Sequence, residues 1–219
     1  MSHLKRQQSP KSWPVVRKGT KYLVKPKGVA NGIPMLIVLR DMLEIAQNRK
    51  EVKRAINMKN ILLNQKTVKD EKNTAVLFDT ISIIPTKKNY RVVFSEKGKF
   101  QLDEIKENET NQKIAKVINK KTLKGKKTQI NLSDGRNFLS DLKCSVNDSV
   151  VVNIKEKEIE KCIPLKEKSK IFVFEGKHVG KKGIIKKILS DAEGHEKMVE
   201  ADVNGSKINV LIKQLVVIE

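Results

Sequence analysis

Positively charged side chains are the residues of this sequence best placed to do chemistry, and that chemistry is the binding of phosphate groups. Arg49, Lys50, Lys53 and Arg54 stand at positions i, i+1, i+4 and i+5 of a segment with helical periodicity, so one face of a helix would carry all four. Four like charges on one face repel one another. A phosphate backbone would relieve that repulsion and release counterions, so the pattern predicts a nucleic-acid surface.

The charge of the whole chain fits such a surface. Its 219 residues include 46 Lys and Arg against 25 Asp and Glu, a formal net charge of +21. Self-repulsion of this size works against a compact state unless a polyanion neutralises it, which favours nucleic acid as the partner. The longest apolar run, Ile33 to Leu39, is broken by Pro34 and is too short to cross a bilayer. An anionic membrane is the less frequent partner of such a basic chain, and we expect nucleic acid and no membrane partner.

Patterns for catalysis or metal binding are missing from the sequence. Cys144 and Cys162 fit neither a zinc-ligand spacing nor a disulfide framework, so we expect two ordinary thiols in a reducing compartment. The glycine-rich segment 176–183 lacks the Gly-Lys-Ser/Thr of a nucleotide-binding loop. Since no Ser/His/Asp set or carboxylate pair is visible either, we expect no enzyme activity, cofactor, metal ion or small-molecule substrate.

A small module must position the basic face. Apolar residues at helical spacing predict a helix from about Pro34 to Glu44. Asn48 can cap a second helix, from Arg49 to Met58. A short hairpin then follows, with strands over 61–63 and 66–68 joined by a turn at Asn64-Gln65.

This order of two helices, a strand, a turn and a strand resembles the RNA-binding module first recognised in the bacterial ribosomal protein S-four. The matching residues are Leu36, Leu39, Arg40, Leu43, Arg49, Val52, Ala55, Ile56, Ile61, Leu63, Asn64 and Val68. The RNA contacts expected of the module are Arg40, Arg49, Lys50, Lys53, Arg54 and Lys66. Ribosomal proteins, RNA-modifying enzymes and some tRNA synthetases all carry this module.

The first 30 residues form a second basic segment, with eight basic residues, three prolines and no acidic residue. Such a segment is poor helix, and we expect an arm that becomes ordered only on a partner. Trp13 and Tyr22 lie among the cations, and aromatic rings in that setting can stack on bases or insert into RNA crevices. We therefore favour an RNA-binding arm over a solvated tail, with contacts through Lys5, Arg6, Lys11, Trp13, Arg17, Lys18, Lys21 and Lys25.

The middle of the chain is rich in strand and turn signals. Strands are predicted over 81–84, 90–94, 115–123, 128–132, 136–139 and 149–154, and a short helix over 107–116. Asp134-Gly135 is a good hairpin signal. Lysines and Arg136 gather around the turns, where RNA contact and a solvated loop cluster are equally compatible with the pattern.

The segment after Ser169 resembles the KOW motif, in which an apolar strand is followed by Gly-Lys-x-x-Gly-x-x-Gly and a second apolar strand. Gly176, Lys177, Gly180, Lys181 and Gly183 match. Glycines let such a loop adopt positive φ and bring backbone N–H groups close to phosphate. The resemblance implies a small SH3-like barrel that contacts RNA through Gly176, Lys177, His178, Gly180 and Lys181.

The complete order of parts resembles one family, the archaeal and eukaryotic e-type small-subunit ribosomal protein four, or S-four-e. Matching phrases run in the family's order, namely 3–6, 10–14, 33–34, 39–41, 78–83, 89–91, 134–137 and 176–180. The resemblance implies a cytoplasmic, structural constituent of the small ribosomal subunit that binds the 5′ body domain of small-subunit rRNA beside neighbouring ribosomal proteins. No long basic extension follows Glu219, which is more typical of the archaeal members.

The expected fold class is α+β and multidomain. Its parts are a basic arm over 1–30, a helix-helix-hairpin RNA-binding module over 31–78, a central β-rich domain over 79–168 and a KOW SH3-like barrel over 169–219. Two other functions stay open. An RNA-modifying enzyme would need a catalytic Asp in a large α/β domain, for which the central region is too short and too rich in strands and lysines. A KOW-bearing transcription or translation factor would not explain the arm around Trp13.

Overall fold

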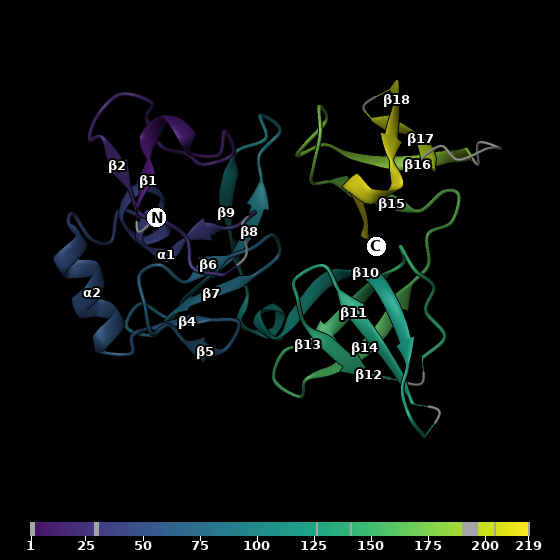
Figure 1. Cartoon of the computed structure of the whole chain (residues 1–219), viewed down its shortest axis with the longest axis horizontal. Helices are drawn as coiled ribbons and strands as arrows, with labels where there is room; N and C mark the ends of the chain where they lie inside the picture. The colour runs from purple at the N-terminus through teal and green to yellow at the C-terminus, as the bar shows by residue number, and fades with distance from the viewer. Residues whose placement is uncertain are drawn as a thin grey trace. The chain divides into compact units, whose positions relative to one another are not determined.

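The chain folds into two compact units that are built mainly of antiparallel β-sheet (Figure 1). The computed structural model describes residues 3–28, 31–125, 127–140, 142–189, 197–203 and 205–218. Unit 1 comprises Met1–Phe94 and Lys99–Asn111, and unit 2 comprises Ser95–Gly98 and Gln112–Glu219. No helix within these described residues is long and apolar enough to span a membrane.

The N-terminal segment is part of the core of unit 1. Strand β1 (Leu4–Lys5) pairs with β2 (Tyr22–Leu23), and a short 3-10 helix, η1 (Arg6–Gln8), follows β1. Trp13 is only 3% exposed, and its indole N–H donates a hydrogen bond of 3.2 Å to the carbonyl oxygen of Gly32. The expectation of an arm that becomes ordered only on a partner is wrong, because the chain itself supplies the apolar surroundings and the acceptor that Trp13 needs.

The first predicted helix is shorter and less regular than expected. Strand β3 (Ile33–Pro34) leads into α1 (Met35–Ile37), which continues as a π-helical segment, η2 (Val38–Met42). The N–H of Leu43 donates to the carbonyl of Val38, the i→i−5 bond of a π-helix. Every residue from Met35 to Leu39 is buried. Core packing therefore surrounds this segment on all sides, and the apolar periodicity read from the sequence did not reveal this.

The second predicted helix, α2 (Arg49–Asn57), is confirmed, and it ends one residue early. The Asn48 side chain accepts a hydrogen bond of 3.0 Å from the N–H of Glu51, and the Glu51 carboxylate accepts from the N–H of Gln47 at 2.7 Å. This reciprocal arrangement satisfies backbone N–H groups at the helix start. Val52 and Ile56 are buried, which turns the charged residues of α2 outward.

One five-stranded sheet completes unit 1. Its order is β5-β4-β7-β8-β9, with β4 (Ile61–Leu63), β5 (Lys66–Thr67), β7 (Thr80–Ile83), β8 (Lys88–Phe94) and β9 (Phe100–Ile105). A small pair, β3 with β6 (Thr74–Ala75), lies outside this sheet. The hairpin expected at β4 and β5 is present, and Asn64 and Gln65 have φ angles of 49° and 59°, as a type I′ turn requires. Because β4 pairs with β7, unit 1 runs on past the boundary expected after residue 78.

The central sheet belongs to unit 2 and has the order β12-β11-β10-β13-β14. Its strands are β10 (Gln112–Thr122), β11 (Thr128–Leu132), β12 (Asn137–Leu139), β13 (Ser149–Asn153) and β14 (Glu158–Ile163). The helix expected over 107–116 is wrong. A 3-10 turn, η3 (Glu107–Asn111), ends where β10 begins, because residues 112–116 pair with β13.

A second five-stranded sheet in unit 2 has the order β18-β17-β16-β15-β19. Its strands are β15 (Lys170–Val173), β16 (Lys182–Leu189), β17 (Met198–Val203), β18 (Ser206–Leu211) and β19 (Leu215–Ile218), with a 3-10 turn, η4 (Ile212–Gln214), before the last. The strands enclose an apolar core that includes Ile171, Ile185 and Leu215. The N–H of Val217 donates to Ser149 Oγ at 2.8 Å, which joins this sheet to the central sheet within unit 2.

Candidate nucleic-acid interface

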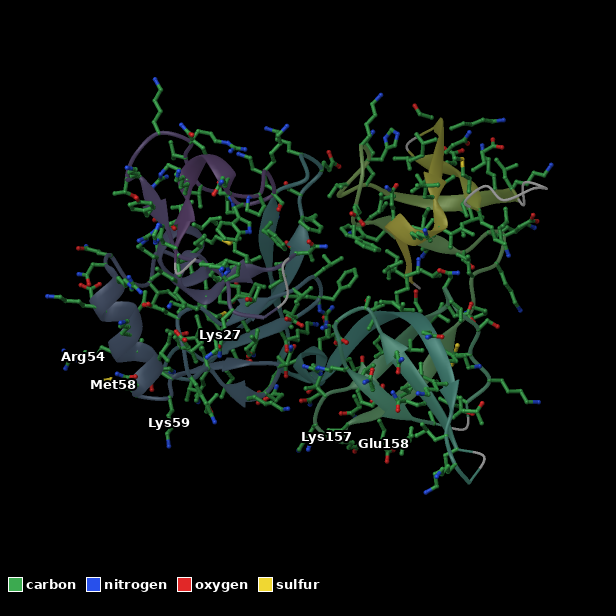
Figure 2. The ribbon with its side chains drawn as sticks, viewed as in Figure 1. Lys27, Arg54, Met58, Lys59, Lys157 and Glu158 are labelled. Atoms are coloured by element: carbon green, nitrogen blue, oxygen red, sulfur yellow. The ribbon has the colours of Figure 1, made fainter. Side chains whose placement is uncertain are left out.

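The four cations predicted on one helix face are all exposed on α2. Lys50 and Arg54 lie on the side of the helix opposite the buried Val52 and Ile56, whereas Arg49 and Lys53, each three residues before one of them, lie next to the buried side. Figure 2 shows Arg54 pointing away from the ribbon, with Met58 and Lys59 beside it at the C-terminal end of α2. A basic surface of Arg49, Lys50, Lys53 and Arg54, which we call the α2 face, is therefore present as the sequence predicted.

Two of these cations share a carboxylate that the sequence analysis did not single out. Arg49 donates from Nε to Glu71 Oε1 at 2.7 Å and also from Nη2 to the same oxygen, and Lys53 Nζ lies 4.0 Å from it. The hydrogen bond to Glu71 raises the pKa of Arg49 further above its ordinary value, against the opposing effect of burial. Glu71 therefore relieves part of the repulsion on this face from within the chain.

Lys50 and Arg54 have no such partner. Neither forms an ion pair with any residue that the structure describes. They stand four residues apart, so they are neighbours on the helix surface. These two side chains are the cations of the α2 face whose full charge is available to an external anion.

Arg40 and Lys66, the other cations expected from the module, differ in their surroundings. Arg40 makes a two-pronged contact with its neighbour Asp41, from Nε to Oδ1 and from Nη2 to Oδ2, both at 2.9 Å. That hydrogen bonding raises the pKa of Arg40 although burial opposes it. Lys66 is exposed on the edge strand β5. Arg40 is thus partly neutralised, whereas Lys66 is open to solvent.

Arg6 has a structural role in the N-terminal segment. Its Nε donates to the Thr20 carbonyl at 2.6 Å, its Nη1 to the Val16 carbonyl at 2.5 Å and its Nη2 to Thr20 Oγ1 at 2.8 Å. Every guanidinium nitrogen is therefore engaged in shaping the loop from Val16 to Thr20. These bonds use three of the five N–H groups of Arg6, which leaves one on Nη1 and one on Nη2 for an RNA contact. The buried Trp13 ring has no face free for a base.

The remaining cations predicted in this segment are exposed. They are Lys5, Lys11, Arg17, Lys18, Lys21 and Lys25. The ammonium group of Lys21 lies 5.5 Å from the centroid of the Tyr22 ring, within the range of a cation–π contact. The basic character expected of this segment is present, on a folded scaffold.

In unit 2, Arg136 lies next to a buried ion pair. Lys113 Nζ is 2.8 Å from Asp134 Oδ2, both side chains are almost fully buried, and Arg136 Nε is 3.6 Å from the same oxygen. Burial on its own would raise the pKa of Asp134, but the charge and hydrogen bond of Lys113 lower it below its ordinary value. Arg136 thus has a local role in neutralising Asp134, which the hairpin signal alone did not indicate.

The glycine-rich loop between β15 and β16 has the backbone that its glycines predict. Gly176 and Gly180 adopt φ angles of 91° and 86°, which favour glycine over other residues. Lys177 is exposed and His178 and Lys181 are partly buried, whereas Gly180 is buried, with no room for a Cβ. Lys177 is therefore the most accessible of the residues predicted here.

The two cysteines are brought together in the core of the central sheet, although they are distant in sequence. Cys162 Sγ lies 3.9 Å from Asp148 Oδ2. Burial, with the thiol of Cys144 and the Asp148 carboxylate close by, raises the pKa of Cys162 to about 12. In the part of the chain that the structure describes, no three His, Cys, Asp or Glu side chains are placed to hold a metal ion.

Comparisons with known proteins show which family has a similar sequence and order of domains. A model described as ribosomal family S4e matches residues 86–159, and a model of the RS4NT domain matches residues 2–28. The small ribosomal subunit protein eS4 of Methanothermobacter thermautotrophicus is 40% identical over 190 residues, covering 85% of this chain and 78% of that protein. The chain belongs to the S4e family of ribosomal proteins. The resemblance to this family is thereby confirmed.

Two further proteins of the S4e family are similar to this chain. The eS4 protein of Nanoarchaeum equitans is 35% identical over 208 residues, covering 93% of this chain and 89% of that protein. A crystal structure of the 30S ribosomal protein S4e from Thermoplasma acidophilum is 25% identical with a TM-score of 0.74, over 87% of this chain and 96% of that one. Because S4e proteins are structural components and not enzymes, the RNA-modifying enzyme is not favoured.

Proposed function

We propose that this chain is a structural constituent of the small ribosomal subunit, where it binds folded small-subunit rRNA and contacts neighbouring ribosomal proteins. Its site of action would be the cytoplasmic ribosome, and its rRNA target the 5′ body domain. Membership of the S4e family supports the ribosomal role. The observation that carries the RNA-binding role is the α2 face, where exposed cations stand on a helix held in place by the buried Val52 and Ile56.

Within the α2 face, Lys50 and Arg54 would make the strongest direct phosphate contacts. Both are exposed, and neither is neutralised by a carboxylate of the described residues. Each phosphate that a cation neutralises adds about 0.7 to 0.9 to the slope of log K against log salt concentration. The pair should therefore account for roughly one to two units of that slope.

The C-terminal sheet would act as a KOW-type, SH3-like barrel with a backbone contact to RNA. The exposed Lys177 and the positive φ of Gly176 support this assignment, because they place a cation beside a backbone that can approach a phosphate closely. The remaining members of the predicted set, His178, Gly180 and Lys181, are less accessible. We expect them to shape the loop more than to bind RNA.

Binding to transcribed small-subunit rRNA, measured over a range of salt concentrations, tests the α2 face. The variant Lys50→Ala/Arg54→Ala should bind more weakly and show a slope smaller by about one to two units. The matched control is Lys155→Ala/Lys157→Ala, which removes the same charge from exposed residues between β13 and β14. Equal slopes for the two double variants would contradict the assignment of the α2 face.

A second measurement tests the ribosomal role itself. The wild-type chain should sediment with small ribosomal subunits through a gradient at high salt. A chain found only in the free pool at the top of the gradient would contradict the proposed function, whatever its affinity for isolated rRNA.

A further inference from the structure

Glu71 is an unusual residue for a basic RNA-binding surface. Its side chain is only 2% exposed, and its backbone is fixed because the Glu71 carbonyl accepts a hydrogen bond of 3.0 Å from the N–H of Leu36 in α1. Among the described residues, Glu71 Oε2 is a buried polar side-chain oxygen that has no hydrogen-bond partner. A buried carboxylate that is only half satisfied is a poor contribution to stability.

The contacts of Glu71 lead directly to the α2 face. Its other oxygen, Oε1, accepts hydrogen bonds from Nε and Nη2 of Arg49 and lies 4.0 Å from Nζ of Lys53. Arg49 and Lys53 stand one helical turn apart, and their side chains are 55% and 57% exposed. One buried anion therefore holds two cations whose outer parts are in solvent.

The geometry leaves donors free on the outer side of Arg49. A guanidinium group has five N–H donors in a planar fork, and the contact with Glu71 uses the edge formed by Nε and Nη2. Nη1 forms no hydrogen bond with the described residues. Fixing one edge orients the opposite edge, and a side chain that is already ordered loses less conformational freedom when a ligand binds.

We propose that Glu71 is a positioning residue for RNA binding: it holds Arg49 and Lys53 so that the α2 face presents ordered donors to the phosphate backbone. The proposal rests on the proposed function and deepens it. It also explains why a chain with a net charge of +21 keeps an acidic group beneath its basic face. Lys50 and Arg54 would contribute positive charge to RNA binding, whereas Arg49 and Lys53 would present hydrogen-bond donors in a fixed orientation.

The proposal and simple charge counting predict opposite results for Glu71→Gln. If Glu71 only subtracts charge, its neutralisation makes the face more basic and strengthens RNA binding. If Glu71 orders its two partners, neutralisation frees both side chains and weakens binding by about three- to tenfold, the effect of ordering one or two long side chains. The control is Glu104→Gln, which removes the same charge from an exposed residue of β9 in the same unit.

The experiment measures the affinity of the full chain for transcribed small-subunit rRNA at fixed salt, with circular dichroism to confirm that each variant is folded. Glu71→Gln should bind more weakly than Glu104→Gln. A folded Glu71→Gln variant that binds as tightly as Glu104→Gln, or more tightly, would overturn the proposal.

A double-variant comparison separates positioning from a general structural effect. In the background Arg49→Met/Lys53→Met, which keeps apolar stems but has no charges to orient, Glu71→Gln should cause no further loss of affinity. A loss as large as in the wild-type background would mean that Glu71 acts on the fold, and the proposal would be wrong. If Arg49→Met/Lys53→Met itself binds like the wild type, the RNA contact of these two residues fails and the proposal fails with it, while Lys50→Ala/Arg54→Ala still tests the proposed function.

A spectroscopic measurement covers the case in which Glu71→Gln lowers stability. The Nε–H of Arg49 should give a resolved, slowly exchanging NMR signal in the wild type, because it donates to a buried carboxylate. The signal should broaden or move to the position of free arginine in Glu71→Gln while the backbone signals of α2 stay in place. An unchanged Arg49 signal in that variant would contradict positioning by Glu71.

Discussion

Lys116 on β10 donates a hydrogen bond of 3.1 Å from Nζ to the carbonyl oxygen of Leu215, the first residue of β19. The same ammonium group also donates to the carbonyl of Ile212, at the start of the 3-10 turn before β19. Lys116 is only 4% exposed. It therefore ties the central sheet of unit 2 to its C-terminal sheet, and no carboxylate of the described residues pairs with it.

The burial of Lys116 predicts a stability that rises with pH. Desolvation lowers the pKa of Lys116 from 10.5 to about 8. Between these values the unfolded chain binds more protons at this site than the folded chain, so stability increases as the pH rises from about 8 to 10.5. At about 1.4 kcal/mol per pKa unit, the full effect is roughly 3 kcal/mol. Urea unfolding at pH 7.5 and at pH 10 measures it.

The control for this pH effect is Lys116→Met, which fills the same space without a titrating group. The free energy of unfolding of the wild type, minus that of Lys116→Met, should grow between the two pH values. Differences that stay constant with pH would show that Lys116 keeps its ordinary pKa in the folded chain.

Because Trp13 is buried, we predict that the N-terminal segment contributes to the stability of the fold. Trp13→Ala removes a large buried ring, which typically lowers the free energy of unfolding by about 3 to 5 kcal/mol. Trp13→Phe keeps most of the apolar area and loses the hydrogen bond to Gly32, so its effect should be smaller. Denaturant unfolding compares the two. If Trp13→Ala were as stable as the wild type but bound rRNA weakly, the segment would be an RNA-binding arm as the sequence suggested.

The lowered pKa of Asp134 leads us to predict that the folded chain loses stability in acid. Its folded-state pKa lies below its ordinary value because of Lys113, although burial alone would raise it. The folded chain releases this proton more readily than the unfolded chain, so the stabilisation is present above the ordinary pKa and is lost as the pH falls through the lowered one. Asp134→Asn should lack this acid-dependent loss and, because it removes one partner of the buried Lys113–Asp134 ion pair, should be less stable at pH 7 by about 3 to 5 kcal/mol. Asp103→Asn, at an exposed position on β9, is the control.

Local signals in the sequence predicted many of the elements, whereas elements and side chains that depend on long-range contacts were missed. Helix α2 could be predicted because its cap, Asn48, and its apolar positions lie within one short segment. Edge strands β9 and β14 were missed because their sequences, FQLDEI and EIEKCI, are too polar to stand out, and pairing on one side stabilises them. Most of the site's cations were found from charge and spacing. Glu71 was missed because only the packing of residues 71–73 on α1 places it beneath α2.

A variant of Arg6 distinguishes a structural role of this cation from a role in binding phosphate. Arg6→Lys keeps the charge but loses the three-directional contact with Val16 and Thr20. The loop should therefore open more often, which raises the rate of tryptic cleavage after the exposed Arg17 and Lys18. The salt slope for rRNA binding should stay the same, because a slope reports the number of neutralised phosphates.

Lys11→Ala provides the converse test of an exposed cation in the same segment. If Lys11 contacts a phosphate, its removal should reduce the salt slope by about 0.7 to 0.9 while tryptic cleavage stays at the wild-type rate. A reduced slope for Arg6→Lys together with unchanged cleavage would assign the phosphate contact to Arg6, and its hydrogen bonds to Val16 and Thr20 would then have to break when RNA binds.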